Sequence, residues 1–405
     1  MKWFKRVGIA MGGLAGLVTV WAAVGALVYS PEYVERVLRS GQSEVGDYLD
    51  GFPLSPLSAS QTPFIFTEAS EEERVRSAFQ PVLGVSDFDA FLAEAETQAF
   101  IVIKNDKILY EHYFNGTDRD SMVTSFSVAK SFDSALIGIA IEEGYIGSVE
   151  DPITEYLPEL LERDPGFERI TIRDVLLMAS GLEYQELRWW LLNGDDPLTT
   201  YYPDQREISL TNTKIIGPPG EYFLYNKYHP QLLGMILERT TGMSVTEYTQ
   251  TRLWDRIGME YDGAWAMDSK ESRFEKMEAG LNARAIDFAK FGRLILNNGD
   301  WNGQQVIPAD WIRESTSLDP TTHKADYYAH SFGPFIYDEG NGYYKYMWYG
   351  QLRDGQQADI AAEGDLGQII YISPTNKVII IRNGTGFGIP LGDWTKAFYQ
   401  VAGNL

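Results

Sequence analysis

The sequence contains no cysteine and only four histidines among its 405 residues. The absence of cysteine excludes disulfide bonds, thiolate metal sites, a cysteine nucleophile and a lipidated N-terminal cysteine. His112, His229, His323 and His330 lack the spacing of metal ligands and predict neither a metal site nor a histidine-based triad. No phosphate-binding glycine loop, H-E-x-x-H motif or G-x-S-x-G motif occurs. We therefore expect neither a metal nor an organic cofactor.

Positive charge is also scarce. The chain has 34 Lys and Arg against 57 Asp and Glu, which gives a formal net charge of −23. Such a surface repels the phosphate backbone, so a nucleic-acid partner is not expected. With 44% hydrophobic and 13% aromatic residues, the chain can bury a large core and is expected to be globular.

An apolar run without charged residues extends from Val7 to Pro31. At about 1.5 Å per helical residue it is long enough to cross a hydrocarbon layer of about 30 Å. Basic residues precede the run and Glu32 follows it, which places the N-terminus in the cytoplasm. The run therefore predicts a single-pass anchor in the inner membrane, with the rest of the chain in the periplasm or outside the cell. A cleaved signal peptide is the alternative, because the small residues Ala23, Gly25 and Ala26 could serve as a cleavage site.

Composition divides the chain into three parts. Residues 1–30 are expected to form a cytoplasmic tip and a transmembrane helix. Residues 31–70 include a stretch rich in proline and serine and are expected to form a linker or an arm. Residues 71–405 are expected to form one domain.

Strand signals lie at both ends of this domain. Residues 99–104 and 107–114 are rich in β-branched and aromatic residues and are joined by Asn105-Asp106, which indicates a hairpin. A second apolar pair, 368–373 and 377–382, lies near the C-terminus. The segment between the two pairs is mostly helical in pattern. We therefore predict an α+β fold, with an antiparallel sheet built from N- and C-terminal segments, flanking helices and a mostly helical insertion.

The chemistry is predicted at Ser127 and Lys130, at the start of an apolar stretch typical of a buried helix. Three residues apart, the two side chains share one face of a first helical turn. A desolvated lysine with a lowered pKa can accept the proton of a serine hydroxyl, and free N–H groups at a helix start favour an oxyanion. A capped helix with an ordinary lysine is the alternative, since about one S-x-x-K match is expected by chance in a chain of this length.

Three further segments make the match more specific. They begin at Leu176-Leu177-Met178, at Pro219-Gly220-Glu221 and at Gly280-Leu281-Asn282. With the serine–lysine motif, their order and spacing resemble the family of class C β-lactamases, D-alanyl-D-alanine peptidases and related esterases, and especially the 6-aminohexanoate-dimer hydrolases. The resemblance spans about residues 95–400 and implies a β-lactamase-like or transpeptidase-like fold.

The resemblance also implies roles for residues outside the first motif. Tyr225 takes the place of the tyrosine that exchanges protons with the nucleophile. The asparagine that usually follows two residues later is replaced by Lys227, so that either Asn226 or the Lys227 ammonium holds a substrate carbonyl, or Lys227 is an ordinary surface lysine. In the third motif, Gly364 lets the backbone approach the substrate, and the Asp365 N–H is expected to complete an oxyanion hole with that of Ser127. Ala362 stands where the family carries a cation for carboxylate-bearing substrates.

These observations predict a serine hydrolase that cleaves a small-molecule ester or amide through an acyl-enzyme on Ser127. Lys130 and Tyr225 are expected to transfer protons. A D-alanyl-D-alanine peptidase or β-lactamase on the same machinery is one alternative. A catalytically inactive, penicillin-binding-like module that binds a wall fragment or a partner protein is the other.

Overall fold

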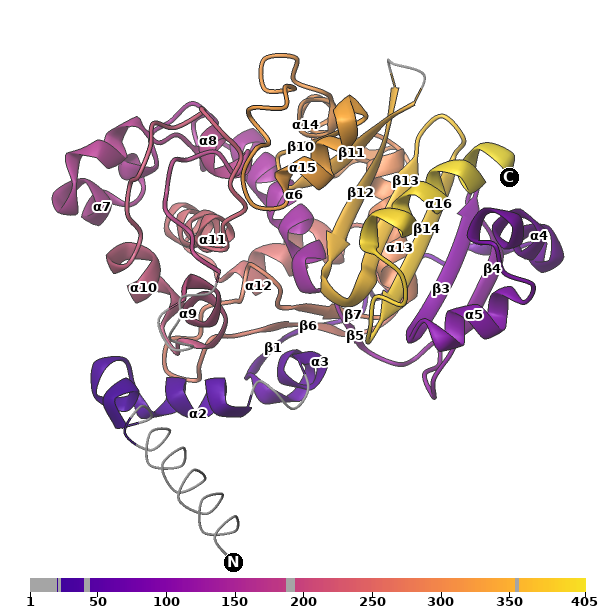
Figure 1. The fold of residues 1–405 in the computed structure, drawn as a ribbon, viewed down its shortest axis with the longest axis horizontal. Helices are drawn as coiled ribbons and strands as arrows, with labels where there is room; N and C mark the ends of the chain where they lie inside the picture. Colours follow the sequence, from indigo (N-terminus) through magenta and orange to yellow (C-terminus); the bar gives the residue numbers. More distant parts are fainter. Residues whose placement is uncertain (1–19, 21–22, 40–43, 187–193, 354–356) are drawn as a thin grey trace, which may run out of the picture.

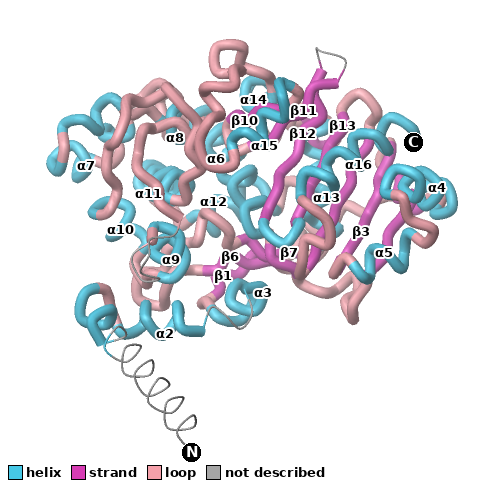
Figure 2. The backbone as a smooth tube through the Cα atoms, viewed as in Figure 1, coloured by secondary structure: helices cyan, strands magenta, loops and turns pink. Residues whose placement is uncertain are grey.

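The computed structural model describes residues 20, 23–39, 44–186, 194–353 and 357–405. An eight-stranded sheet has helices on both faces, and a mostly helical region lies beside it (Figures 1 and 2). A second, four-stranded sheet lies below the junction of the two regions in the view of Figure 1.

The strands are β1 (Leu54–Leu57), β2 (Thr67–Glu68), β3 (Thr97–Lys104), β4 (Lys107–Tyr113), β5 (Val123–Thr124), β6 (Gly263–Ala266), β7 (Leu281–Ala283), β8 (Asp300–Trp301), β9 (Gln304–Gln305), β10 (Gly342–Lys345), β11 (Trp348–Arg353), β12 (Gln357–Gly364), β13 (Gln368–Ser373) and β14 (Val378–Gly384).

The α-helices are α2 (Pro31–Arg39), α3 (Glu44–Gly46), α4 (Glu72–Leu83), α5 (Phe88–Glu94), α6 (Ala129–Glu142), α7 (Pro158–Arg163), α8 (Ile172–Leu176), α9 (Asp195–Tyr201), α10 (Gln205–Thr211), α11 (Tyr228–Thr241), α12 (Val245–Thr249), α13 (Ala285–Leu296), α14 (Ala309–Thr316), α15 (Gly333–Tyr337) and α16 (Leu391–Asn404). Short 3-10 or π-helical turns are η1 (Asp47–Gly51), η2 (Phe126–Val128), η3 (Ile153–Glu155), η4 (Pro165–Arg169), η5 (Gln250–Trp254), η6 (Asp338–Gly340) and η7 (Asp365–Gly367).

The large sheet joins the two ends of the domain, as predicted from the sequence. Its strand order is β10-β11-β12-β13-β14-β3-β4-β2, and the C-terminal β14 pairs antiparallel with the N-terminal β3, with Ile381 opposite Ile101. The hairpin predicted at Asn105-Asp106 is confirmed, and both residues have positive φ, as a tight β-turn requires. The pairing of β2 with β4 is parallel, unlike that of the other strands in this sheet.

The two faces of this sheet bury separate cores because successive side chains of a strand point in opposite directions. Phe100 and Val102 of β3 pack in one core with α4, α5 and α16. Ile101 and Ile103 pack in the other, larger core, which contains α6 and α13. The larger core continues without a break into the helical region, so the sheet and the insertion form one unit.

The insertion contains more β-structure than its sequence pattern predicts. Strands β5, β6 and β7 pair with the N-terminal β1 in the order β1-β6-β7-β5. They are only two to four residues long, too short for an alternating pattern to stand out. Helix α8 is short and ends at Leu176, and Met178, two residues later, has a φ of 56°, which a helix does not allow.

The segment before β1 packs closely against the domain (Figure 1). Arg36 of α2 donates to the carbonyl oxygen of Asp268 at 2.5 Å and lies 5.2 Å from the centre of the Phe52 ring. Tyr33 of the same helix is fully buried, and its ring lies 5.9 Å from that of Tyr202. The described residues of the segment 31–57, namely 31–39 and 44–57, therefore contribute to the folded core, and we name them the N-terminal arm.

The prediction of an N-terminal transmembrane helix is corrected. Among the residues that the structure describes, no helix is both long enough and apolar enough to cross a bilayer. Most of the predicted span, residues 7–19 together with 21 and 22, lies outside the described residues. The inner-membrane location that depended on this span has no support in the structure.

Helix α6 is the central helix of the larger core and gives a test of the packing. The rings of Phe132 and Phe291 stack with centroids 3.7 Å apart, and both side chains are fully buried. Phe132→Ala removes this contact and leaves a cavity, so it should lower the free energy of unfolding by about 3–5 kcal/mol. Leu161→Ala, on the outer helix α7, should change it by less than about 0.5 kcal/mol because Leu161 is 38% exposed. Equal urea-unfolding midpoints for the two variants would contradict this account.

Candidate active site

Ser127 lies in the turn that connects β5 to α6. The turn is the 3-10 helix η2, and Phe126 within it has a φ of 42°, which a bulky residue rarely adopts. The Ser125 N–H donates to the carbonyl oxygen of Leu281 at 2.8 Å, which ties the turn to β7. The predicted helix thus begins just after Ser127, and the serine side chain remains partly exposed on the surface of a cleft.

Lys130 extends from the first turn of α6 to Ser127. Its Nζ lies 2.8 Å from Ser127 Oγ and donates to the carbonyl oxygen of Glu278 at 2.6 Å. Burial is the main reason that the pKa of Lys130 falls to about 7, and the Lys227 ammonium lowers it further. A neutral amine that donates to Glu278 retains a lone pair for the serine proton. The geometry therefore suits Lys130 as a base toward Ser127.

Glu278 links this pair to the N-terminal arm. Its carboxylate forms a fully buried ion pair with Lys276 at 2.6 Å and accepts a hydrogen bond from the Tyr48 hydroxyl at 3.3 Å. The Tyr48 ring also packs edge-on against Phe126, with centroids 5.3 Å apart. The arm thus packs behind both the turn that carries Ser127 and the carbonyl that holds Lys130.

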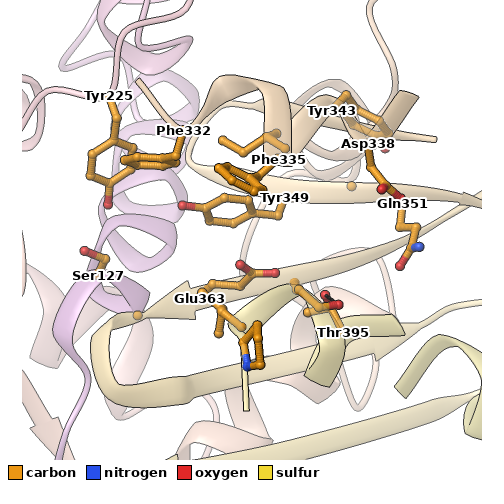
Figure 3. Close-up of a pocket in the computed structure, with 18 of the residues that line it drawn as sticks. Ser127, Tyr225, Phe332, Phe335, Asp338, Tyr343, Tyr349, Gln351, Glu363 and Thr395 are labelled. Carbon is orange, nitrogen blue, oxygen red and sulfur yellow. Dashed lines mark hydrogen bonds between the residues drawn. The ribbon is translucent and has the colours of Figure 1, made fainter. Parts of the chain in front are cut away.

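Tyr225 precedes α11 and completes the group around the serine. Its hydroxyl points toward Ser127 (Figure 3), and the Lys130 Nζ lies 5.0 Å from the centre of its ring. Burial raises the pKa of Tyr225 above its ordinary value, although Ser127 and the Lys227 ammonium oppose this effect. Burial outweighs the effect of the nearby ammonium, and the phenol keeps its proton at neutral pH. Tyr225 is therefore suited to donate a proton.

The two residues after Tyr225 point in different directions. The Asn226 side chain is buried, accepts from the Tyr228 N–H at 2.9 Å and contacts the carbonyl oxygen of Leu182, so it stays in the protein interior. Lys227 lines the cleft and forms an ion pair with Asp196 at 2.6 Å. Of the alternatives left open by the sequence, the lysine and not the asparagine lies at the cleft, and its charge already has a partner.

Burial disfavours the Lys227 ammonium, but the Asp196 carboxylate outweighs burial and raises the pKa of Lys227 above its ordinary value. The pKa values of two lysines near one serine are thus shifted in opposite directions. The pKa of one is lowered mainly by burial, and the other remains a cation because a carboxylate faces it.

The backbone at Gly364 approaches the serine turn closely. A Cβ added there would lie 2.5 Å from the carbonyl oxygen of Ser125 and 3.0 Å from the backbone nitrogen of Ser127. Only a residue without a side chain fits this contact. Asp365 follows directly at the start of η7, and its side chain is exposed.

A cleft of about 1060 Å³ is lined in part by Ser127, Tyr225, Lys227, Gly364 and Asp365 (Figure 3). Tyr225, Phe332 and Tyr349 form an aromatic wall beside Ser127, and Phe335 lies farther out at 86% exposure. The carboxylate of Glu363 points into the cleft from the opposite wall (Figure 3).

The sequence prediction missed Glu363 and assigned its position in the cleft to Ala362. Ala362 is fully buried in the larger core, so its side chain faces away from the cleft. Alternation along a strand ending at Gly364 indicates that residue 363 lies on the opposite face, and this signal was available in the sequence. Asp196 and Glu278 were also missed, and both lie in segments without a motif that singles them out.

No group of His, Asp or Glu in the described part of the chain is arranged to hold a metal ion. His229 forms a hydrogen bond with Ser180 at 2.6 Å, but both side chains are buried and neither lines the cleft. Burial lowers the pKa of His229 to about 3, so the imidazole is neutral. The hydrogen-bonded pair of Ser180 and His229 is therefore part of the core.

The sequence of this chain is similar to those of known proteins. The profile of the family described as Beta-lactamase matches residues 87–391, which is more than half of the chain. The 6-aminohexanoate-dimer hydrolase of Paenarthrobacter ureafaciens is 26% identical over 311 residues, which cover 73% of this chain and 74% of that protein. The resemblance stated from four motifs is thereby confirmed.

Two solved structures have a fold similar to that of this chain. A Bacillus anthracis protein proposed to be a 6-aminohexanoate-dimer hydrolase has a TM-score of 0.74 and 25% identity, covering 88% of this chain and 92% of that one. A penicillin-binding protein from Bacillus halodurans has a TM-score of 0.57 and 16% identity, covering 78% of this chain and 98% of that one, which shows a shared fold.

Gly364→Ala tests the close contact with the serine turn. The added methyl group must displace the backbone around Ser127, so kcat/KM for an ester should fall by about 10²- to 10³-fold while the protein stays folded. Gly392→Ala is the matched control, because it also lines the cleft but a Cβ there meets nothing within 4 Å. Similar activities of the two variants, measured with p-nitrophenyl butyrate, would refute the prediction.

Lys227→Met tests the electrostatic effect on Lys130. Because the Lys227 ammonium lowers the pKa of Lys130, its removal should raise that pKa. Activity that needs neutral Lys130 rises as pH increases through about 7, and the variant should need a higher pH for the same rise. Lys396→Met, which removes a cleft cation paired with Asp338, should leave the profile in place. A shift to lower pH in Lys227→Met would contradict the assignment.

Proposed function

The chain belongs to the β-lactamase family, and on this premise we propose that it is a serine hydrolase that cleaves ester or amide bonds through an acyl-enzyme on Ser127. The observation that carries the proposal is the 2.8 Å contact between Ser127 Oγ and the buried Nζ of Lys130. A serine hydroxyl needs a base to attack a carbonyl at neutral pH, and a desolvated lysine amine is one of the few groups that supplies it.

In acylation, neutral Lys130 takes the Ser127 proton as Oγ attacks the carbonyl carbon. The negative charge that develops on the carbonyl oxygen is received by the backbone N–H groups of Ser127 and Asp365, which Gly364 brings together. Tyr225 gives its phenolic proton to the leaving oxygen or nitrogen and recovers one from Lys130. The bond to the leaving group then breaks, and the acyl group remains on Ser127.

In deacylation, the same groups act in reverse. Neutral Lys130 is the final acceptor of one proton from a water molecule, and the oxygen of that water attacks the acyl carbon. The Tyr225 hydroxyl relays this proton, giving one to Lys130 as it receives one from the water. The tetrahedral intermediate uses the same two N–H groups. Its collapse returns a proton to Ser127 Oγ and releases the acid, so the cycle consumes one water and needs no cofactor.

Two features favour neutral esters and amides over penicillins and peptidoglycan termini, which carry a carboxylate. Ala362 is buried and offers no cation, and Lys227 is already paired with Asp196. A charge-assisted hydrogen bond to a carboxylate contributes about ten- to a hundredfold in binding, and neither residue supplies a free one. The alternatives are a peptidase, a β-lactamase and an inactive binding module, and each would give a different result in the labelling test below.

The test is labelling of the purified protein with a fluorophosphonate probe and, separately, with a fluorescent penicillin. We expect labelling by the fluorophosphonate alone, its loss in Ser127→Ala, and ester turnover in that variant below about a thousandth of the wild-type rate. Labelling by both probes would indicate the peptidase or β-lactamase, and labelling by neither would indicate the inactive module. Labelling of Ser127→Ala would refute Ser127 as the nucleophile.

A further inference from the structure

The segment between β6 and β7 ends in a tight turn that carries two charged side chains into the core. Lys276 and Glu278 are both fully buried and form an ion pair at 2.6 Å. The Gly280 N–H donates to the Lys276 carbonyl oxygen at 2.6 Å, and a Cβ on Gly280 would lie 2.7 Å from the same oxygen. The turn is therefore closely held, and this holds the Glu278 carbonyl that accepts from Lys130.

The N-terminal arm closes over this ion pair. Through β1 the arm pairs with β6 of the second sheet (Figure 1). The Lys276 Nζ lies 4.6 Å from the centre of the Phe52 ring and 5.4 Å from that of Tyr48. It also donates to the carbonyl oxygen of Thr200 at 2.7 Å, while the Tyr48 hydroxyl donates to Glu278. Aromatic faces stabilise a cation, so the arm holds in the core the counter-ion that Glu278 needs.

The arm lies outside the part of the chain that the family profile matches, which begins at residue 87. The contacts that Tyr48 and Phe52 make with the ion pair are therefore a feature of this chain that the family match does not describe. A role for the ion pair must be argued from its own geometry and charge.

The Glu278 carboxylate acts on Lys130 from inside the core. Burial lowers the pKa of Lys130 most and the Lys227 ammonium lowers it further, whereas Glu278 is the largest influence in the opposite direction. Asp133 is also fully buried, and burial raises its pKa well above the ordinary value, which favours its neutral form. Asp196 acts from the cleft side and is paired with Lys227 at 2.6 Å. Among the described residues, none donates a hydrogen bond to the buried Oε2 of Glu278.

The other charged neighbours of the ion pair act on Lys276. Burial lowers the pKa of Lys276, and the Glu278 carboxylate opposes this effect most strongly. Arg36 of the arm adds to the effect of burial, and Asp268 opposes it. Lys276 therefore depends on Glu278 for its charge, and a variant that keeps only one of the two leaves an unpaired group in the core.

We propose that Glu278 is a positioning residue of the hydrolase, whose carboxylate stabilises the Lys130 ammonium that forms as Ser127 loses its proton. The proposal rests on the function given above and adds a buried group that does not touch the substrate. In this step the proton moves from Ser127 Oγ to the Lys130 Nζ, and the Glu278 carboxylate keeps its charge. The N-terminal arm contributes because Tyr48 and Lys276 hold that carboxylate in place.

The test measures kcat/KM for p-nitrophenyl butyrate against pH in Glu278→Gln and in Lys276→Met/Glu278→Gln. Because the carboxylate favours protonated Lys130, its removal should move the rise of activity, expected near pH 7 in the wild-type protein, about one pH unit lower. The plateau should fall by up to about tenfold, because a weaker base accepts the serine proton less readily. The double variant leaves no unpaired charge in the core and gives the result if Glu278→Gln does not fold.

Glu275→Gln is the matched control. Glu275 is buried three residues away, but its carboxylate accepts from the N–H and the hydroxyl of Thr246 on α12. This variant should keep the wild-type profile. A lower rate in Glu278→Gln without a shift of the profile would show a structural role alone and overturn the proposal. A shift to higher pH, or an equal shift in Glu275→Gln, would overturn it as well.

NMR of protein labelled with ¹³C at the lysine ε-carbons separates this proposal from the hydrolase function, because it follows the titration of Lys130 without turnover. Lys130→Met assigns the signal by its disappearance. A lower titration midpoint of Lys130 in the Glu278 variants supports the proposal even if the wild-type protein hydrolyses no ester. Ester hydrolysis with an unchanged midpoint leaves the hydrolase function in place and overturns the role of Glu278.

Discussion

Removal of Lys130 from water is the constraint on which the proposed chemistry depends. An exposed lysine is a cation at neutral pH and has no lone pair for a serine proton. The larger core surrounds Lys130, which is 1% exposed, and burial lowers its pKa to about 7. The carbonyl oxygen of Glu278 receives one N–H and orients the amine toward Ser127. Fold and reactivity are linked here, because the packing that stabilises α6 also lowers the pKa of its lysine and so makes the neutral amine available near pH 7.

The N-terminal arm completes that dry environment from a distant part of the sequence. Tyr48 covers Phe126 and contacts the Glu278 carboxylate, while Lys276 neutralises that carboxylate within the core. Charges on the cleft side are balanced separately, by the pair between Lys227 and Asp196. The two sets of ion pairs allow one neutral amine to persist among several charged groups.

The sequence predicted the large sheet and the serine–lysine pair because each has a strong local signal: the apolar hairpin around Asn105-Asp106 and the short spacing from Ser127 to Lys130. It missed the second sheet, whose strands are too short to show a period. The contacts of Glu278 and Asp196 were not predictable, since they join segments far apart in the chain. The transmembrane prediction used the length of the uncharged run and the charges on either side of it, and it is not supported by the described residues.

The central claim is that a substrate's acyl group passes through Ser127, and it can be tested during turnover. The protein is mixed with p-nitrophenyl butyrate, quenched in acid within the first turnover, digested and examined by mass spectrometry. The account predicts one butyryl group on the peptide that contains Ser127, present early and lost as the ester is consumed. A butyryl group on another residue, or hydrolysis with no acylated peptide at any time, would contradict it.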